Sequence, residues 1–408
     1  MPYFCSVIAD DPGICREMTG KLVPSKKRAA VALLVETSNA FSREVLHGVR
    51  DWMREHGAWA IHLSEMGRGN QPPEWLKHWK GEGILARIEN REMAAAVRKT
   101  GLPVVNVSAA DVAAEFPSVV SDSAGIAQLA AQHLIERGLR HFGYCGDERF
   151  IWAQRHGENF ARQVRQAGGE CSVFPVRPGD ASDWKGTHAR LKRWLDNLPK
   201  PAGVMTCYDI KGQQVLDVCR AAGLRVPDEV AVISQHDDEL LCELCDPPLS
   251  SVVPDARRVG YEAAVLLDGW IRGKRPAALR MEIPPVRVAV RQSTDLIAVG
   301  DVRLADAMRF LRQHACGAIT VDDIARVAGM SRSLLERKFR EAFQSSPWDH
   351  VIQLRLREAE RLLKQTGLTV AEIALKAGFG TPEHFSATFR RLTGHSPRAG
   401  RGKRGREM

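Results

Sequence analysis

The sequence contains no apolar run that approaches the roughly 18 residues a membrane-spanning helix requires. Its N-terminus also lacks the charged segment, apolar stretch and cleavage site of a secretion signal. The 9 cysteines are scattered along the chain without the repeating pattern of a disulfide framework. These absences predict a soluble cytoplasmic protein with reduced thiols and no membrane partner.

The usual signatures of a cofactor, metal or catalytic site are also missing. Cys242 and Cys245 are close together, but no second pair of ligands follows at the spacing of a zinc site. Gly67 and Gly69 lack the preceding strand and following helix of a phosphate-binding loop. The histidines before residue 294 have no metal-like spacing, and no Ser-His-Asp order stands in the context of a nucleophile elbow. We therefore expect no enzymatic activity, no cofactor and no metal.

The chain is long enough for more than one hydrophobic core, since single cores stop growing at about 250 to 300 residues. Its pattern changes at several points, and each change suggests a boundary. We expect a flexible N-terminal extension at 1–28, a ligand-sensing domain at 29–295, a linker at 296–301, a helical domain at 302–398 and a basic tail at 399–408.

In the larger domain, short β-branched runs alternate with amphipathic stretches, which is typical of parallel βαβ units. Strands are predicted at Ala30–Glu36, Gly83–Arg87, Val104–Val107, His141–Cys145, Gly203–Cys207 and Val230–Ser234, with Met281–Arg291 as a final extended strand. Helices are predicted at Ser42–His56, Glu92–Thr100, Gly125–Arg137, Gly157–Ala167, Gly186–Asn197, Lys211–Ala222 and Arg258–Arg272. This order predicts a doubly wound α/β fold in two lobes, with a ligand between the carboxyl ends of the strands.

The positive charge is concentrated near the C-terminus. Residues 301–408 contain 20 Lys and Arg against 12 Asp and Glu, so they carry +8 of the net +9. Such a basic region is typical of a protein that binds the phosphates of nucleic acid. A solvated basic face with a loose basic tail explains the charge equally well.

A repeat separates these two interpretations. Ile324-Ala325 and Ala328-Gly329 recur 49 residues later as Ile373-Ala374 and Ala377-Gly378. Each copy predicts a helix-turn-helix, and a further helix, Trp348–Lys364, joins the two copies. The paired helices are Val321–Ala328 with Arg332–Phe343 and Val370–Ala377 with Pro382–Leu392, and Ser331 and Thr381 are expected to cap the second helix of each pair.

The second helix of each motif has one apolar and one polar face. Leu335 and Phe339, and later Phe385 and Phe389, are expected in the core. The polar faces can hydrogen-bond base edges in the major groove, and the joining helix would hold them about one turn of DNA apart. The predicted DNA-contacting residues are Ser333, Glu336, Arg337, Arg340, Glu383, His384, Ser386, Ala387 and Arg390. The alternative is a helical bundle with an arginine-rich surface.

The segment Val321–Phe339, together with Ile373–Phe379, Phe385, Phe389 and Pro397, resembles the AraC/XylS family of regulators. That resemblance covers about 100 residues and implies two helix-turn-helix motifs that read double-stranded DNA. Pro382 departs from the family pattern, which often has a polar residue there, and this puts one base contact in doubt.

The larger domain resembles the periplasmic-binding-protein-like domain of LacI-type repressors. The resemblance rests on Val119–Gly125, Ala130–Leu134, Gly138–Tyr144, Val226–Val230 and Val286–Thr294. A sensor of this type ahead of an AraC-type domain is similar to the xylose-responsive regulators, which implies a sugar effector such as xylose or another pentose. It also implies a homodimer, and contact with RNA polymerase if the protein is an activator.

A sugar site needs polar groups for the hydroxyls and an aromatic plane for the ring. Asp122 and Asp209 suit the first role, although either could instead cap a helix, and Phe41 or Trp152 suits the second. Where the xylose-responsive pattern has an Arg after the Trp and an Asp after the strand at Val232, this chain has His156 and His236. The effector could therefore differ from xylose.

We interpret the chain as a sugar-responsive transcriptional regulator, with activation favoured over repression. One alternative is a cytoplasmic sugar-binding or sugar-processing protein whose helical C-terminus serves association only. Another is a DNA-binding factor whose sensor no longer binds a ligand.

Overall fold

The computed structural model describes residues 28–296 except 58, 68, 148, 178, 181, 277 and 278, two short strands before them, and residues 302–400. The chain forms two compact units, residues 1–296 and 297–408. The strands β1 (Cys15–Arg16) and β2 (Leu22–Val23) pair antiparallel. Apart from these strands, Arg28, Leu296 and residues 399–400, the expected extension, linker and tail lie outside the described residues.

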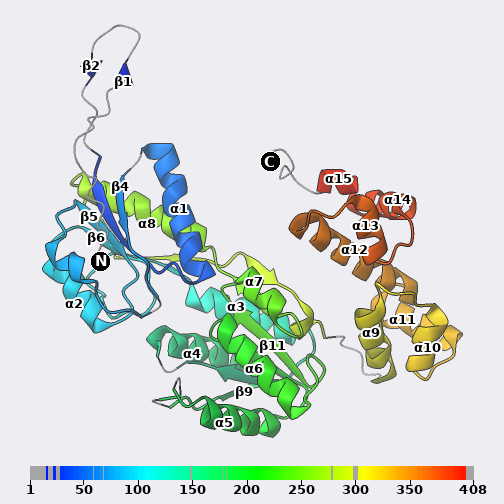
Figure 1. The fold of residues 1–408 in the computed structure, drawn as a ribbon. Helices are drawn as coiled ribbons and strands as arrows, with labels where there is room; N and C mark the ends of the chain where they lie inside the picture. The colour runs from blue at the N-terminus through cyan, green and yellow to red at the C-terminus, as the bar shows by residue number, and fades with distance from the viewer. Residues whose placement is uncertain are drawn as a thin grey trace, which may run out of the picture. The chain divides into compact units, whose positions relative to one another are not determined.

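The first lobe of the larger unit (Figure 1) contains a six-stranded sheet. The strand order is β13-β7-β6-β5-β3-β4, and all neighbours are parallel. Its strands are β3 (Ala30–Leu34), β4 (Ala60–Leu63), β5 (Gly83–Ala86), β6 (Val104–Asn106), β7 (Ser118–Ser121) and β13 (Arg280–Ile283). One face packs against α1 (Ala40–His56) and α8 (Ala256–Ile271). The other packs against the 3-10 helix η1 (Glu74–His78) and α2 (Arg91–Lys99).

The second lobe repeats this plan in the order β14-β12-β11-β10-β8-β9. Its strands are β8 (His141–Cys145), β9 (Glu170–Val173), β10 (Ala202–Thr206), β11 (Val230–Gln235), β12 (Ser250–Val253) and β14 (Arg287–Ala289), of which only β14 is antiparallel to its neighbour. The helices are α3 (Ser123–Ile135), α4 (Ile151–Gln166), α5 (Trp184–Asn197), α6 (Asp209–Ala222) and α7 (Glu239–Leu244), followed after β14 by η2 (Gln292–Thr294). The predicted two-lobed α/β fold is confirmed.

The chain crosses between the lobes three times, after β7, after β12 and between β13 and β14. The prediction of a single final strand over Met281–Arg291 is wrong, because β13 and β14 belong to different sheets. Pro284 and Pro285 lie between them and have no backbone N–H for a sheet ladder. The extended segment is therefore a crossover with a short strand at each end.

The predicted start of the fourth helix is also wrong. Gly157 was expected to open the helix, but α4 begins six residues earlier at Ile151. A Cβ atom at Gly157 would lie 2.6 Å from Tyr144 Cδ1, so this glycine, in the middle of α4, lets the helix pack closely against Tyr144 of β8. Trp152 and His156 consequently lie one turn apart on the same helix.

Four strands of the two lobes were not predicted, namely β4, β7, β9 and β12. β4 and β9 are largely exposed edge strands, so they lack the continuous apolar pattern of a buried strand. β7 and β12 are largely buried, but each carries two serines in four residues. None of the four therefore stood out from its neighbours in the sequence.

The smaller unit is entirely helical over the residues that the structure describes. Its helices are α9 (Val302–His314), α10 (Val321–Val327), α11 (Arg332–Phe343), α12 (Pro347–Gln365), α13 (Val370–Lys376), α14 (Pro382–Thr393) and α15 (Pro397–Gly400). The predicted caps are confirmed, because Ser331 accepts a hydrogen bond from Leu334 N and Thr381 accepts one from His384 N. Among the described helices of either unit, none is long and apolar enough to cross a bilayer.

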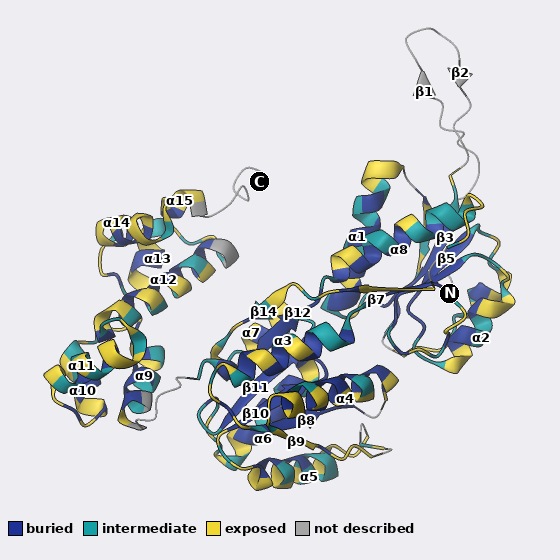
Figure 2. Ribbon diagram, turned by 180° about the vertical axis from the view of Figure 1, so that it is seen from behind, coloured by how far each residue is buried: buried dark blue, intermediate teal, exposed yellow. Residues whose placement is uncertain are grey.

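Each helix-turn-helix motif has its own core (Figure 2). Leu335 and Phe339 are buried in the first, and Phe385 and Phe389 in the second, as predicted. The long helix α12 contributes to both, because Val351 packs in the first core and Ile352 in the second. The two motifs thus share one connecting helix.

Helices α1 and α8 of the first lobe cross so closely that glycine is required at the crossing. A Cβ atom at Gly48 would lie 1.9 Å from Arg257 O, and one at Gly260 would lie 1.9 Å from Val45 O. No real Cβ atom approaches a carbonyl oxygen so closely, and backbone atoms cannot move aside as a flexible side chain can.

We expect Gly260→Ala to lower the free energy of unfolding by about 1–3 kcal/mol, because the helices must separate. Gly269→Ala is the matched control on the same helix, where an added Cβ meets nothing within 4 Å. This control should stabilise by about 0.5–1 kcal/mol, because alanine favours helix over glycine. Urea unfolding followed by circular dichroism measures both, and equal effects of the two variants would contradict the close crossing.

Candidate ligand cleft and DNA-reading helices

A cleft between the two lobes contains two connected chambers that share Phe41 and His236. The wider chamber has a volume of about 300 Å³, at the lower limit of the usual range of small-molecule sites, and the narrower chamber has a volume of about 30 Å³. The wider is lined by Ser38, Asn39, Ala40, Phe41, Arg149, Phe150, Tyr208, Asp209, Ile210, His236, Asp238 and Leu241. The narrower is lined by Phe41, Arg87, Val107, Ala109, Ser121, Ile126, Trp152, His156, Gln235 and His236.

Five of the six residues predicted to bind the ligand line this cleft. Phe41, at the start of α1 in the first lobe, lies with its ring centroid 5.0 Å from that of His236 in the second. Trp152 lies 6.0 Å from His236, again between ring centroids. Aromatic rings from both lobes therefore face one another across the cleft. His156 and Asp209 complete the five.

Asp122 does not line either chamber. Its side chain caps α3, where Oδ1 accepts hydrogen bonds of 2.9 and 3.0 Å from Ala124 N and Gly125 N. This is the alternative role that its position just after a strand had left open.

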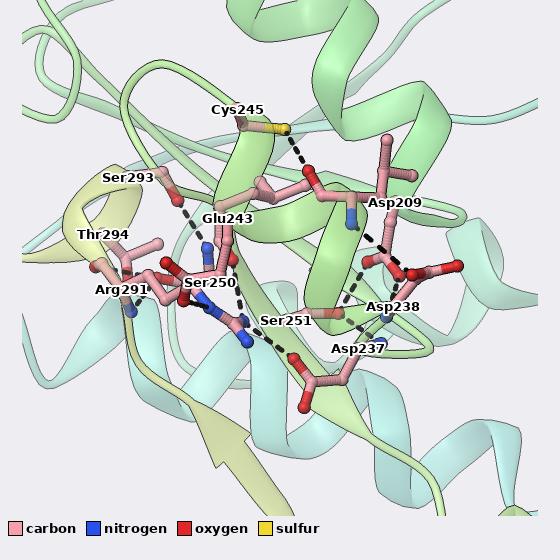
Figure 3. Close-up of polar contacts among 12 residues, drawn as sticks. Asp209, Asp237, Asp238, Glu243, Cys245, Ser250, Ser251, Arg291, Ser293 and Thr294 are labelled. Atoms are coloured by element: carbon pink, nitrogen blue, oxygen red, sulfur yellow. Dashed lines mark hydrogen bonds and ion pairs between the residues drawn. The ribbon is translucent and has the colours of Figure 1, made fainter. Parts of the chain in front are cut away.

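Asp209 is almost completely buried at the first turn of α6 (Figure 3). Its Oδ1 accepts a hydrogen bond of 2.7 Å from Ser251 Oγ, and its Oδ2 accepts one of 2.8 Å from Asp238 N. Burial raises the pKa of Asp209 to about 7, although these hydrogen bonds favour the carboxylate. A proton is therefore available at this wall of the cleft near neutral pH.

Polar atoms in the narrower chamber lack full hydrogen bonding. Burial and the nearby Arg155 lower the pKa of His156 to about 4, and a weak contact with Gln235 offsets them only partly. Within the described residues, His156 Nδ1, Gln235 Oε1 and Ser121 Oγ complete no hydrogen bond of normal geometry. Buried polar atoms of this kind are costly unless a ligand or water satisfies them.

A buried ionic cluster behind Phe41 was not predicted. Arg87 Nη1 lies 2.7 Å from Glu36 Oε1, and Arg87 Nη2 lies 2.9 Å from Glu89 Oε1. Burial opposes the charge of Arg87, but the two carboxylates outweigh it and raise the pKa of Arg87 above its ordinary value. The guanidinium carbon lies 5.1 Å from the centre of the Phe41 ring and so supports that ring from behind.

A second network, between Asp147, Arg149 and Tyr208, was also missed. Asp147 Oδ2 accepts hydrogen bonds of 2.8 Å from Arg149 Nη2 and 3.0 Å from Tyr208 Oη. These residues, like Glu36 and Arg87, follow or end predicted strands. Polar residues at the carboxyl ends of parallel strands were the signal that could have identified them.

Within the described part of the smaller unit, no other element covers the polar faces of α11 and α14, so these faces are accessible to a partner. Ser333, Arg337, Arg340, Glu383, His384, Ala387 and Arg390 are exposed, and Glu336 and Ser386 are half-buried. Arg332 Nε donates a hydrogen bond of 3.0 Å to Glu336 Oε1, and Arg337 Nε lies 3.9 Å from Glu341 Oε1. Exposed ion pairs of this kind contribute little stability and exchange readily for other partners.

Three family models match consecutive parts of the chain. Residues 30–123 match a XylR N-terminal domain, residues 131–294 a periplasmic binding protein-like domain, and residues 324–403 a helix-turn-helix domain. The xylose operon regulatory protein of Escherichia coli K12 is 29% identical over 380 residues, which cover 91% of this chain and 96% of that protein. Its counterpart from Haemophilus influenzae is 25% identical over 375 residues, 88% of this chain and 95% of that protein.

A solved structure described as the xylose-binding transcription activator xylR superposes with a TM-score of 0.74. It is 28% identical, and the match covers 92% of this chain and 98% of that one. The chain has the domain order of the regulators that join a periplasmic-binding-protein-like sensor to an AraC-type helix-turn-helix domain. In this regulator, the first two matched segments correspond largely to the two lobes, so the cleft lies where they meet.

The regulator should show the raised pKa of Asp209 as a pH-dependent stability. Because the folded-state pKa of about 7 exceeds the ordinary 3.8, the stability that Asp209 contributes is fully present below about pH 4 and is lost as pH rises through 7. We expect the free energy of unfolding of the wild type to fall across this window relative to Asp209→Asn, which mimics the protonated group. Urea unfolding at several pH values measures the difference.

The buried His156 acts in the opposite direction, because its depressed pKa removes stability as pH falls below 6.5. Its effect is common to the wild type and to Asp209→Asn, so it cancels in their difference. A difference that stays constant between pH 4 and pH 7 would show that Asp209 has an ordinary pKa.

Proposed function

We propose that this chain is a sugar-responsive transcriptional regulator. In this proposal, residues 302–398 bind double-stranded DNA, and the cleft binds a neutral sugar, xylose or another pentose. We further propose that the protein acts as a homodimer and activates transcription through contact with RNA polymerase, in line with the activator it superposes on.

The observation that carries the sugar proposal is the lining of the cleft. Aromatic rings (Phe41 and Trp152) and incompletely bonded polar groups (His156, Gln235 and Ser121) converge there from both lobes. Sugar hydroxyls can satisfy those polar groups, while the C–H face of a sugar ring packs on an aromatic plane.

The charges near the cleft favour a neutral ligand. Arg87 is shared between two carboxylates, and Arg149 is paired with Asp147, so neither guanidinium is available to a phosphate. Asp238 adds negative charge to the wider chamber, and Asp209, whose pKa is raised to about 7 by burial, adds only part of a charge near neutral pH. A phosphorylated or acidic sugar would be repelled there, since burying an unpaired charge is costly.

The DNA proposal is supported by the exposed polar faces of α11 and α14 and by the match of residues 324–403 to a helix-turn-helix domain. Each face carries a different mixture of side chains, with Ser333, Glu336 and Arg337 on the first and Glu383, Ser386 and Ala387 on the second. Two different faces would read two different short sequences.

Replacement of His156 by leucine tests the ligand proposal. His156→Leu should lower the affinity for the effector about 10-fold to 100-fold, because a polar contact to a hydroxyl is lost. The same change should leave stability unchanged or raise it, since it removes a poorly bonded polar group from a buried site. Calorimetric titration with xylose and other pentoses, together with urea unfolding, measures both quantities.

His133 provides the control, because it is also buried and its pKa is also lowered to about 4. It lies outside the cleft, and its Nε2 contacts Thr294 Oγ1 at 2.7 Å. His133→Leu should therefore lower stability and leave sugar affinity unchanged. If His156→Leu only destabilises, or if the unmodified protein gives no heat with any pentose, the cleft is not the sugar site.

Arg337 tests the DNA proposal. Arg337→Ala should weaken binding to the specific operator about 10-fold to 100-fold, while binding to unrelated DNA changes little. Arg193→Ala, an exposed arginine on α5 of the sensor, is the control and should change neither. Gel-shift titrations at several salt concentrations measure these affinities, and an absence of salt-dependent duplex binding would favour a sugar-binding protein without a DNA target.

A further inference from the structure

A second cavity is lined by residues of the second lobe alone. Its volume is about 190 Å³, and it is lined by residues of the segments that follow β8 and β9 and by residues of α5 and α6. Helices α5 and α6 lie side by side on one face of the sheet (Figure 1). The cavity is next to β8, which has β9 on one side and β10 on the other, and such switch points are frequent ligand sites in open α/β sheets.

One wall of this second cavity is apolar and includes an exposed tryptophan. Trp184, the first residue of α5, is 65% exposed, although Phe174 and Leu191 beside the cavity are buried. The ring of Trp184 lies 5.0 Å from that of His188, between centroids. An indole held at the mouth of a cavity presents a broad apolar plane to whatever enters.

The facing wall is polar but has balanced charge. Asp147 is buried, its pKa is lowered to about 2, and it is paired with Arg149 and approached to 3.7 Å by Lys211 Nζ. Asp180 is paired with Arg190. An anionic ligand would find these cations engaged and their carboxylates nearby, whereas neutral hydroxyls can both donate to the carboxylates and accept from Lys211 and Gln214.

We propose that this second cavity is a binding site for a neutral hydroxylated ring, a monosaccharide, separate from the cleft between the lobes. Arg149 lines both sites and donates to Asp147 and Tyr208, so the two sites share a wall. Binding at one site should therefore change the affinity at the other, and the effect must be reciprocal.

The test uses full-length protein labelled with fluorotryptophan, in which the resonance of Trp184 is assigned by its loss in Trp184→Phe. The probes are xylose, arabinose, ribose, glucose and galactose, each titrated to about 10 mM so that millimolar dissociation constants are detected. At least one sugar should shift the Trp184 resonance to saturation. The shift should persist in His156→Leu, whose cleft site is impaired, so failure of the cleft proposal and failure of this one are distinguishable.

Two neighbouring glutamines on α6 provide a matched pair. Gln214 lines the cavity and Gln213 does not, and both are half-buried. Gln214→Ala should weaken the binding reported by Trp184 about 5-fold to 10-fold, and Gln213→Ala should leave it unchanged.

Three results would overturn the proposal. The first is a Trp184 resonance that none of the five sugars moves. The second is a shift that disappears in His156→Leu, because the signal then reports the cleft. The third is tighter binding of glucose 6-phosphate, titrated alongside as an anionic probe, than of any of the five sugars, because the cavity would then select anions.

Discussion

The parallel direction of the strands is the constraint on which both lobes depend. Because neighbouring strands run the same way, the residues that follow them meet at one edge of each sheet. Arg87 could not remain buried without Glu36, and these two meet only because β3 and β5 are adjacent parallel strands in register. The same holds for Asp209, which follows β10. It accepts a hydrogen bond from Ser251 of β12, two strands away in the sheet. A polar cleft is thus a consequence of the sheet topology.

The helical unit uses the same local features, a capping box and a glycine turn, in both of its motifs. Thr320 with Asp323 and Thr369 with Glu372 form a capping box at the start of the first helix in each motif. Gly329 and Gly378 follow those helices with positive φ, which turns the chain toward the second helix. Because the turns are set locally, the polar faces of α11 and α14 can vary without disturbing either core.

A single buried arginine links the two motifs. Arg355 of α12 donates to Ala315 O at 2.6 Å and to Gly317 O at 2.9 Å, just after α9. A Cβ atom at Gly378, in the turn of the second motif, would lie 2.6 Å from Cys316 O and 3.0 Å from Arg355 Nε. The end of α9, the middle of α12 and the second turn therefore meet, so neither motif can move far without breaking these contacts.

The sequence predicted the features that depend on local pattern. The repeat, the caps at Ser331 and Thr381 and the buried Phe339 and Phe389 all follow from spacing within a helix, and the structure confirms them. Gly157 was misread because its reason is a contact with Tyr144 on another element, which no local pattern records. The ionic cluster at Arg87 was missed for the same reason, since its partners are far apart in sequence.

Asp122 shows that one local pattern is compatible with two roles, ligand binding and helix capping. An aspartate after a strand suits both a ligand hydroxyl and a helix N-terminus, and here it caps α3 where the chain first passes from one lobe to the other. Asp255 caps α8 in the same way, at the second passage. A cap satisfies free backbone N–H groups at the start of a helix, so these two carboxylates stabilise the helices that follow the crossovers and do not line the cleft. The residues that face one another across it, Phe41 with His236 and Arg43 with Asp238, then decide how the lobes meet. A ligand between the lobes shifts an equilibrium between two arrangements of the lobes only if it binds those arrangements unequally, and a sensor requires such a difference in affinity.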